Sequence, residues 1–249
     1  FMYFDEDLVL ELRLNLLDLY VDYFVIVESK YNHKGEPKKL NFNIKNFKKF
    51  EKKIIYLVFD QEPSDLYKFE KKDTQADISS KYIFNAGKRE NGQRNFISQG
   101  LKNASSEDII IISDLDEIPN LTEINFKTIK NEIIIFRHEM FYYKFNLKLP
   151  NYKWSGSKAC RMKNLKSPQW LRNIKDKRFG FYRIDTFFSK TKYRNLSIIE
   201  NGGWHFTCIK RPEDIHKKLL TFAHHQDYES SEITLQELKN KINEKRVLY

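Results

Sequence analysis

The chain has 249 residues, of which 41% are hydrophobic and 15% aromatic, and this composition excludes a disordered protein. No apolar run reaches the roughly 18 residues that a membrane-spanning helix needs. The 44 Lys and Arg outnumber the 34 Asp and Glu, and the net charge of +10 predicts an anionic partner: a nucleic acid, a phosphorylated substrate or an acidic membrane surface. The lysines are scattered along the chain, which is also typical of a solvated surface, so charge alone does not separate these partners.

The first half of the chain alternates helical and strand patterns. The predicted order is helix, strand, strand, helix, strand, at residues 5–20, 23–29, 53–59, 89–104 and 108–113. The first helix is expected to turn a row of leucines inward, at Leu8, Leu12, Leu16 and Leu19. The polar segment 60–88 is interpreted as a lid or a crossover. This order predicts a doubly wound α/β layer.

The second half of the chain has a different sequence pattern, in which aromatic and polar residues alternate. Strands are predicted at 132–149, 153–162, 180–190 and 201–208, and helices at 211–225 and 232–246. No internal repeat or clean linker divides the chain, so we predict a single domain, 1–249, with an α/β front and a mixed back.

The ends and cysteines of the chain bear on its compartment. The opening FMYF is typical of a strand, and we expect that strand to begin before residue 1. The first residues have no secretory-signal layout. We therefore expect Cys160 and Cys208 to be reduced, buried thiols, and the protein to be cytoplasmic.

One short stretch, EDIIIISDLDEIP (107–119), runs four isoleucines directly into Asp114, Asp116 and Glu117. Ligands of doubly wound sheets collect at the carboxyl ends of strands, where this cluster is expected. Carboxylates this close together repel, and a divalent cation such as Mg²⁺ or Mn²⁺ would remove that cost. The alternative is that the acids cap a helix starting at Pro119. We favour a metal site, because one capping acid is ordinary whereas three after such a strand are not.

Two chemistries use Asp-x-Asp after an apolar strand. In phosphatases of the haloacid-dehalogenase type the first Asp, here Asp114, is a nucleophile. Those enzymes usually carry the motif near the start of the chain, whereas here it lies in the middle. In glycosyltransferases of the GT-A type the pair holds a metal that neutralises the diphosphate of a nucleotide-sugar. A nucleotide-binding half before the motif (1–119) and an acceptor-binding half after it (120–249) match this second layout.

Several motifs together resemble a known family. The runs are DEDLVLELRLNLLDLYVDYFVIVES, NGQRNFISQGL, DIIIISDLDEIP, GGWHFT and IHKKL, in that order. They are similar to glycosyltransferase family 17, the β-1,4-mannosyl-glycoprotein 4-β-N-acetylglucosaminyltransferases and their microbial relatives. The resemblance spans roughly residues 3–225, and 130–200 is its least diagnostic part. It implies a GT-A fold with a Rossmann-like mixed sheet flanked by helices, a UDP-sugar donor such as UDP-GlcNAc, Mn²⁺ or Mg²⁺, and inversion at the anomeric carbon.

The resemblance also implies roles for individual residues. Asp114 and Asp116 match the metal-binding acids, and Glu117 the acid beside them. His205 matches the histidine of the Gly-Trp-His motif and could complete a Mn²⁺ shell. The alternative for His205 is a core histidine beside Trp204.

Binding the donor requires cations near its diphosphate. Lys217 and Lys218, in the helix after the histidine motif, are candidates. Arg94 is a third, although an i,i+4 ion pair with Glu90 would explain it equally well. Glu28, at the end of the 23–29 strand, is a candidate for contact with the nucleoside, and the alternative is that it closes the strand.

An inverting transfer needs a general base for the acceptor hydroxyl. The candidates are Glu200, just before NGGWH, then Asp185, and as a weaker third Glu139. Aromatic side chains that could stack on sugar faces, or belong to the core, are Tyr142, Tyr143, Trp154 and Trp204.

The sequence therefore predicts a metal-dependent inverting glycosyltransferase that moves GlcNAc from a UDP-sugar to an oligosaccharide, lipid-linked or glycoprotein glycan. The phosphatase is the first alternative. A basic nucleic-acid-binding module is the second, and no nucleic-acid-binding signature supports it. The positive charge could also hold the protein at the inner face of an anionic membrane.

Overall fold

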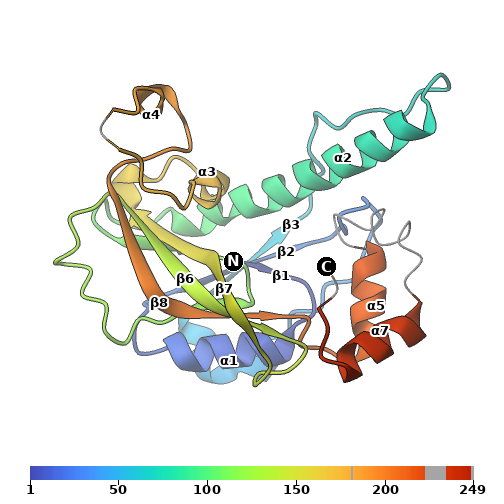
Figure 1. The fold of residues 1–249 in the computed structure, drawn as a ribbon, viewed down its shortest axis with the longest axis horizontal. Coiled ribbons are helices and arrows are strands. Elements are labelled where there is room, and N and C mark those ends of the chain that lie inside the picture. Colours follow the sequence, from blue (N-terminus) through green and yellow to red (C-terminus); the bar gives the residue numbers. More distant parts are fainter. Residues whose placement is uncertain (181, 222–233, 248–249) are drawn as a thin grey trace.

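The computed structural model describes residues 1–180, 182–221 and 234–247, and it has two β-sheets flanked by helices (Figure 1). The first sheet is fully parallel, in the order β1 (Met2–Tyr3), β2 (Phe24–Ser29) and β3 (Ile54–Phe59). Helix α2 (Gln75–Phe96) and the 3-10 helix η2 (Ile97–Leu101) pack against β2, and η2 also against β3. The predicted doubly wound layer is thus present only in these three strands.

The second sheet is mixed and has five strands in the order β4-β7-β6-β8-β5. Their bounds are β4 Ile109–Ile112, β5 Glu117–Pro119, β6 Ile133–Tyr142, β7 Lys148–Arg161 and β8 Leu196–Thr207. Only β6 and β8 run parallel, and their register shifts between Phe136 and His138. The prediction of strands at 132–149, 153–162 and 201–208 is confirmed, although β8 begins earlier than expected.

The two edge strands of this sheet are joined by only four residues, 113–116. In a flat sheet the two edge strands would lie roughly 19 Å apart. The fully extended chain from Ile112 to Glu117 spans at most about 18 Å. The joining segment is also a turn, because the Glu117 amide donates to the Asp114 carbonyl at 3.2 Å. The sheet must therefore curve, and the acidic residues lie where its edges approach.

The tetra-isoleucine strand β4 is covered on both faces, as an all-apolar strand requires. Ile110 and Ile112 are buried in one core cluster, together with Val27 and Leu171. Ile109 and Ile111 pack against the other cluster, which contains the inner side of α1. Two hydrophobic layers thus fix the position from which the acidic residues emerge.

Helix α1 (Asp7–Leu17) forms where predicted but turns a different face inward. The expected face is wrong: Leu8 is 58% exposed and Leu19, beyond the helix, is 88% exposed. The buried residues are Val9, Leu10, Arg13, Leu14 and Leu17. A leucine-rich helix offers two rows at helical spacing, and the row that the structure buries includes an arginine.

Helix α2 begins at Gln75, well before the predicted start at residue 89. Thr74 accepts from the Asp77 amide and Asp77 accepts from the Thr74 amide, which is a capping box. The supposed lid 60–88 therefore contains most of a long helix. Its hydrophobic pattern is weak because only Asn85, Ala86, Gln93 and Arg94 are buried.

The remaining α-helices of the described chain are α3 (Pro168–Asn173), α4 (Asp185–Phe188), α5 (Pro212–Thr221) and α7 (Leu235–Asn243), and two further 3-10 helices are η1 (Ile44–Lys53) and η3 (Met162–Asn164). The predicted strand at 180–190 is wrong, because its described residues form turns and α4. Ile215 and Leu219 of α5 and Leu238 of α7 are buried together, and the end of the helix predicted at 211–225 lies outside the described residues. Cys160 and Cys208 are free, and Cys160 is buried. No helix of the described chain is long and apolar enough to cross a bilayer.

Candidate active site

The backbone of the acidic segment, residues 113–117, is held by the buried side chain of Arg13 from α1. Its Nη1 donates to the carbonyls of Asp114 at 3.2 Å and Glu117 at 2.8 Å, and its Nη2 to Ser113 Oγ at 2.6 Å. Burial lowers the pKa of Arg13 only to about 10, so the guanidinium stays charged at neutral pH. This arginine fixes the turn that presents the acids.

Glu117 is a structural acid, since its side chain is only 1% exposed. Its Oε1 accepts from Trp154 Nε1 at 2.5 Å and from Arg172 Nη2 at 2.6 Å, and its Oε2 accepts from the Asp114 amide at 2.9 Å. A Cβ at Gly156 would stand 3.2 Å from its carboxyl carbon, so the glycine leaves room for this packing. Glu117 thus stabilises the turn from the protein interior.

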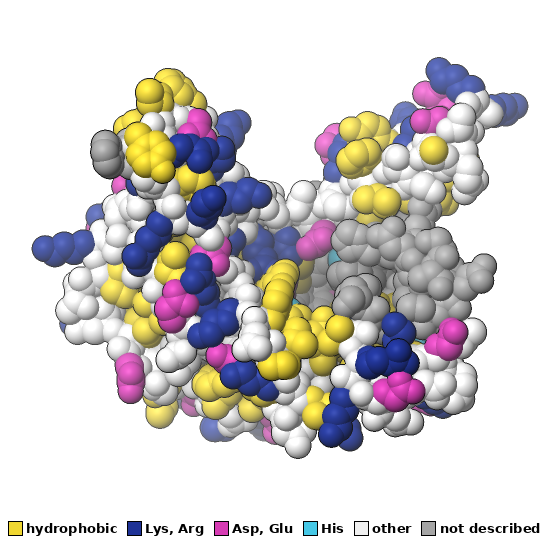
Figure 2. Space-filling view, in the orientation of Figure 1, with side chains coloured by type: hydrophobic (Ala, Val, Ile, Leu, Met, Phe, Trp, Pro, Cys, Tyr) yellow, Lys and Arg dark blue, Asp and Glu magenta, His cyan; other side chains and the backbone are white. Residues whose placement is uncertain are grey.

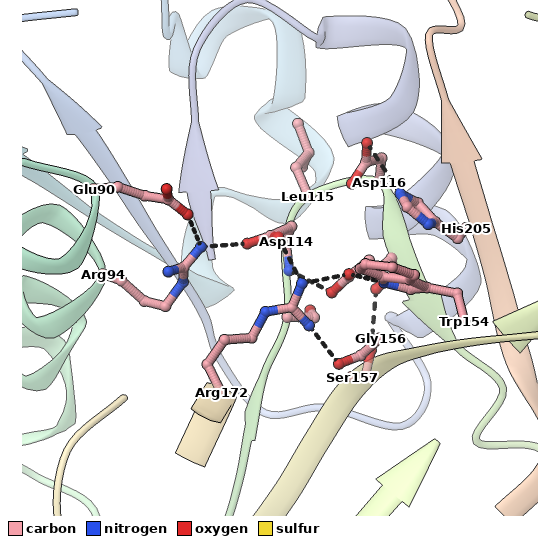
Figure 3. A network of polar contacts seen from close by, with 12 residues as sticks. Glu90, Arg94, Asp114, Leu115, Asp116, Trp154, Gly156, Ser157, Arg172 and His205 are labelled. Carbon is pink, nitrogen blue, oxygen red and sulfur yellow. Dashed lines mark hydrogen bonds and ion pairs between the residues drawn. The ribbon is translucent and has the colours of Figure 1, made fainter. Parts of the chain in front are cut away.

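Asp114 lies between two arginines from different helices (Figure 3). Oδ1 accepts from Arg94 of α2 at 3.0 Å, and Oδ2 accepts from Arg172 of α3 at 2.8 Å. Burial alone would raise the pKa of Asp114, but Arg172 and Arg94 outweigh it and hold that pKa well below its usual range. Arg94 also donates to Glu90 at 2.7 Å, so the predicted i,i+4 pair and the contact with Asp114 coexist.

Asp116 and His205 face each other on the other side of the segment (Figure 3). His205 Nε2 lies 3.6 Å from Asp116 Oδ2, and the Phe206 amide donates to the Asp116 carbonyl at 2.9 Å, which ties the segment to β8. Burial would lower the pKa of His205, but the Asp116 carboxylate outweighs it and raises that pKa. The ring also tilts against Trp154, with centroids 5.4 Å apart.

This pair offers one carboxylate oxygen and one imidazole nitrogen, a donor set that suits Mn²⁺. His205 Nδ1 is buried and finds no hydrogen-bond partner among the described residues, so the imidazole is not committed to a second protein contact. The part of the chain that the structure describes contains no group of three or more His, Cys, Asp or Glu placed to hold an ion. A divalent cation would therefore fit here only with further oxygens supplied by a ligand or by water.

Both halves of the chain line a cavity of about 750 Å³ beside the acidic segment. Arg94, Asp114 and Asp116 come from the first half, and His205 and Lys218 from the second. The wall also carries the aromatic side chains Tyr142, Tyr152 and Trp154. The cavity thus combines acids, cations and aromatic faces, as a binding site for a polar ligand can.

Comparison with known proteins places the chain in a family. The profile of glycosyltransferase family 17 matches residues 2–246, nearly the whole chain. The chain belongs to glycosyltransferase family 17. The β-1,4-mannosyl-glycoprotein 4-β-N-acetylglucosaminyltransferases of Mus musculus and Homo sapiens are each 27% identical to it over 89% of its length. The matched region covers 42% and 43% of those relatives, so the chain spans less than half of their length. No solved structure matches the chain.

The residues that the sequence predicts for the site do not all reach the cavity. Of the predicted cations, Arg94 and Lys218 line it, and Lys218 donates to Glu6 at 2.7 Å. Lys217 is exposed on α5 and does not line it. Glu28 is fully buried and accepts from Lys38 at 2.6 Å and from backbone amides of the following loop, so it holds that loop in place.

The predicted bases also lie away from the cavity wall. Glu200 is 60% exposed and pairs with Arg137 at 2.8 Å. Asp185, on α4, pairs with Arg183 and Lys192, each at 2.7 Å. Glu139 pairs with Lys148 and Lys153, and none of the three acids lines the cavity. The acids that line it outside the acidic segment, among the described residues, are Glu6 and Glu90.

Two arginines that sequence reasoning missed organise the site, Arg13 and Arg172. The signal for Arg13 was present, because a charged residue sat at helical spacing among Leu10, Leu14 and Leu17. Arg172 gave no local signal, since it reaches Asp114 and Glu117 across more than fifty residues of sequence.

Proposed function

We propose that this chain is a metal-dependent inverting glycosyltransferase of the GT-A type, which moves N-acetylglucosamine from UDP-GlcNAc to a glycan. Membership of family 17 and the activity for which its mammalian relatives are named support the reaction class. The observation that carries the proposal is the pair Asp116 and His205, 3.6 Å apart on the wall of a 750 Å³ cavity.

Asp116 and His205 are the residues that would hold Mn²⁺ or Mg²⁺. When bound, the cation would neutralise the charge that develops on the UDP leaving group. Asp114 contributes differently, because both of its oxygens accept from arginines and it keeps Arg94 and Arg172 at the edge of the site. It orders the donor side of the cavity rather than acting as a second metal ligand.

The remaining steps are binding of the diphosphate, removal of a proton from the acceptor and positioning of the acceptor sugar. Lys218 and Arg94 line the cavity and would attract the diphosphate. The acceptor hydroxyl must lose a proton as it attacks the anomeric carbon from the face opposite UDP. Glu6 and Glu90 line the cavity, but they pair with Lys218 and Arg94, the cations placed at the diphosphate, and therefore lie on the wrong side of the donor to receive that proton. Tyr152 and Trp154 offer faces on which the acceptor sugar would stack.

The acceptor is proposed as a glycan on a glycoprotein, an oligosaccharide or a lipid carrier, since the relatives named above act on a mannosyl-glycoprotein. The phosphatase alternative has no support in the comparisons. It is also disfavoured by Asp114 itself, because a carboxylate bonded to two arginines is a poor nucleophile.

Calorimetry and a transfer assay test the proposal together. UDP should bind tightly only when Mn²⁺ is present, and Asp116→Asn should remove that dependence and lower transfer from UDP-GlcNAc by about 10²-fold or more. Glu123→Gln, which alters an exposed acid outside the cavity, is the matched control and should behave as the wild type. Metal-independent binding of UDP, or transfer by Asp116→Asn at the wild-type rate, would rule out the role given to Asp116.

A further inference from the structure

A raised lobe beside α3 carries an unusual concentration of exposed hydrophobic side chains. The α4 lobe, defined as residues 175–180 and 182–194, stands clear of the sheets (Figure 1). Its most exposed apolar or aromatic side chains are Tyr182 at 72%, Ile184 at 69%, Phe187 at 72% and Phe188 at 85%. Single exposed hydrophobic residues are common on soluble proteins, but four within seven residues are a patch.

The same lobe is strongly basic. It contains seven Lys or Arg and two Asp, a net charge of +5, which is half the net charge of the chain in less than a tenth of its length. Both acids are paired, Asp185 with Arg183 at 2.7 Å and Asp176 with Arg137 at 3.0 Å. Figure 2 shows Lys and Arg side chains beside the hydrophobic ones at the top left of the molecule. The basic surface is therefore concentrated here rather than only scattered.

The lobe is held in a defined conformation, although its tip is exposed. The Lys175 amide donates to the Thr191 carbonyl at 2.8 Å, which closes the base of the lobe. Trp170 of α3 donates to the Lys190 carbonyl at 2.9 Å. The Arg194 guanidinium donates to the Arg183 carbonyl at 2.7 Å and lies 4.3 Å from the centre of the Phe187 ring. Phe187 and its basic neighbours are thus presented together by the fold.

We propose that the α4 lobe docks the protein on an anionic lipid bilayer, with Ile184, Phe187 and Phe188 entering the interface and the surrounding Lys and Arg binding lipid phosphates. Aromatic side chains favour the membrane–water interface, and lysines beside them gain from the negative surface potential. An interface between proteins fits less well, because the cores of such interfaces are depleted in Lys. The N-terminal end of α2 rises on the same side of the molecule (Figure 1), and the surface is hollowed between the two (Figure 2).

Vesicle co-sedimentation tests this docking without donor or acceptor, so its result is independent of the proposed function. The protein should sediment with phosphatidylglycerol-containing vesicles, remain in solution with pure phosphatidylcholine vesicles, and be released by high salt. Phe187→Ser combined with Phe188→Ser should lower partition about tenfold or more, because two aromatic side chains no longer enter the interface. Lys177→Gln and Lys190→Gln should each lower it roughly fivefold.

Leu19→Ser is the matched control, since Leu19 is 88% exposed but lies outside the lobe, and its partition should equal that of the wild type. Thermal unfolding of each variant verifies that the fold is retained. The proposal is overturned if the wild type does not sediment with the anionic vesicles, or if the double Phe variant sediments as well as the wild type. It is also overturned if a concentration-dependent dimer in solution is dissolved by the double Phe substitution, because the patch would then be a contact between copies of the chain.

Discussion

The two sides of the acidic segment 113–117 are built in different ways. On the arginine side, Asp114 and Glu117 share Arg172, and Asp114 has Arg94 in addition. On the histidine side, Asp116 faces His205 at 3.6 Å. The acids on the arginine side are paired with arginines within the protein, whereas the Asp116 carboxylate has only the contact with His205 among the described residues, and we propose that it acts on a ligand. Substitutions on the arginine side should therefore mainly lower the stability of the fold, and substitutions on the histidine side should mainly lower activity.

The largest loss of stability is expected from removing Arg172, the cation that Asp114 and Glu117 share. Arg172→Met should lower the free energy of unfolding by about 3–5 kcal/mol, because it leaves the buried Glu117 carboxylate without its guanidinium. Asp116→Asn should change that free energy by less than about 0.5 kcal/mol, because the side chain is 25% exposed and makes one polar contact in the described structure. Urea denaturation measures both values.

Arg172→Lys is the control for charge without geometry. Lysine keeps the positive charge but cannot reach Asp114, Glu117 and the Gly156 carbonyl at once, as the Arg172 guanidinium does. An intermediate loss of stability is expected. Equal destabilisation by Arg172→Met and Asp116→Asn would break the comparison, since both sides would then support the fold alike.

A second, smaller effect concerns pH. Arg172 and Arg94 hold the pKa of Asp114 below its usual range, despite burial that would raise it. A depressed carboxyl pKa stabilises the folded state above the unfolded value, about 3.9, and this contribution is lost as the pH falls through the folded value. In EDTA, Asp114→Asn should therefore cost about 1–2 kcal/mol near neutral pH, a modest figure because the side chain is one-third exposed. Wild type and variant should converge below pH 4, and a pH-independent difference would refute this assignment.

The sequence predicted the position of the acidic segment because that prediction needed only local information. Four isoleucines followed by Asp114 and Asp116 specify a buried strand with acids at its end, and β4 forms at those residues. The histidine of the Gly-Trp-His motif could be placed beside them only through the family resemblance. The structure then brings His205 to Asp116 through the pairing of β5 with β8.

What sequence reasoning could not supply are the residues defined by tertiary packing. Leu8 and Leu12 have the same i,i+4 spacing on α1 as Leu10 and Leu14. Only the packing of α1 against the sheets decides which of these two faces is buried. Glu200 was favoured as a base because it is near His205 in sequence. However, β8 carries the two in one extended strand, and Glu200 ends exposed beside Arg137. Proximity in sequence along a strand is therefore a poor guide to proximity in a site.

The smallest change in the free energy of unfolding is expected at His138 on β6, the strand that pairs with the part of β8 that carries His205. Its side chain is fully buried, and neither ring nitrogen finds a partner among the described residues. Burial lowers the pKa of His138 to about 3, so the ring is neutral in the folded protein. His138→Leu should leave the free energy of unfolding unchanged or raise it by up to about 1 kcal/mol, because it removes two unsatisfied polar atoms.

His138→Ala is the matched control and should lower the free energy of unfolding by about 2 kcal/mol, because it leaves a void. The wild type should also lose stability relative to His138→Leu as the pH falls from about 6.5 towards 3, since only the unfolded chain then binds a proton at this site. If His138→Leu destabilises the protein as much as His138→Ala, the ring nitrogens must be hydrogen-bonded in solution. His138 would then support the acidic segment through polar contacts, as the arginines do on the opposite side.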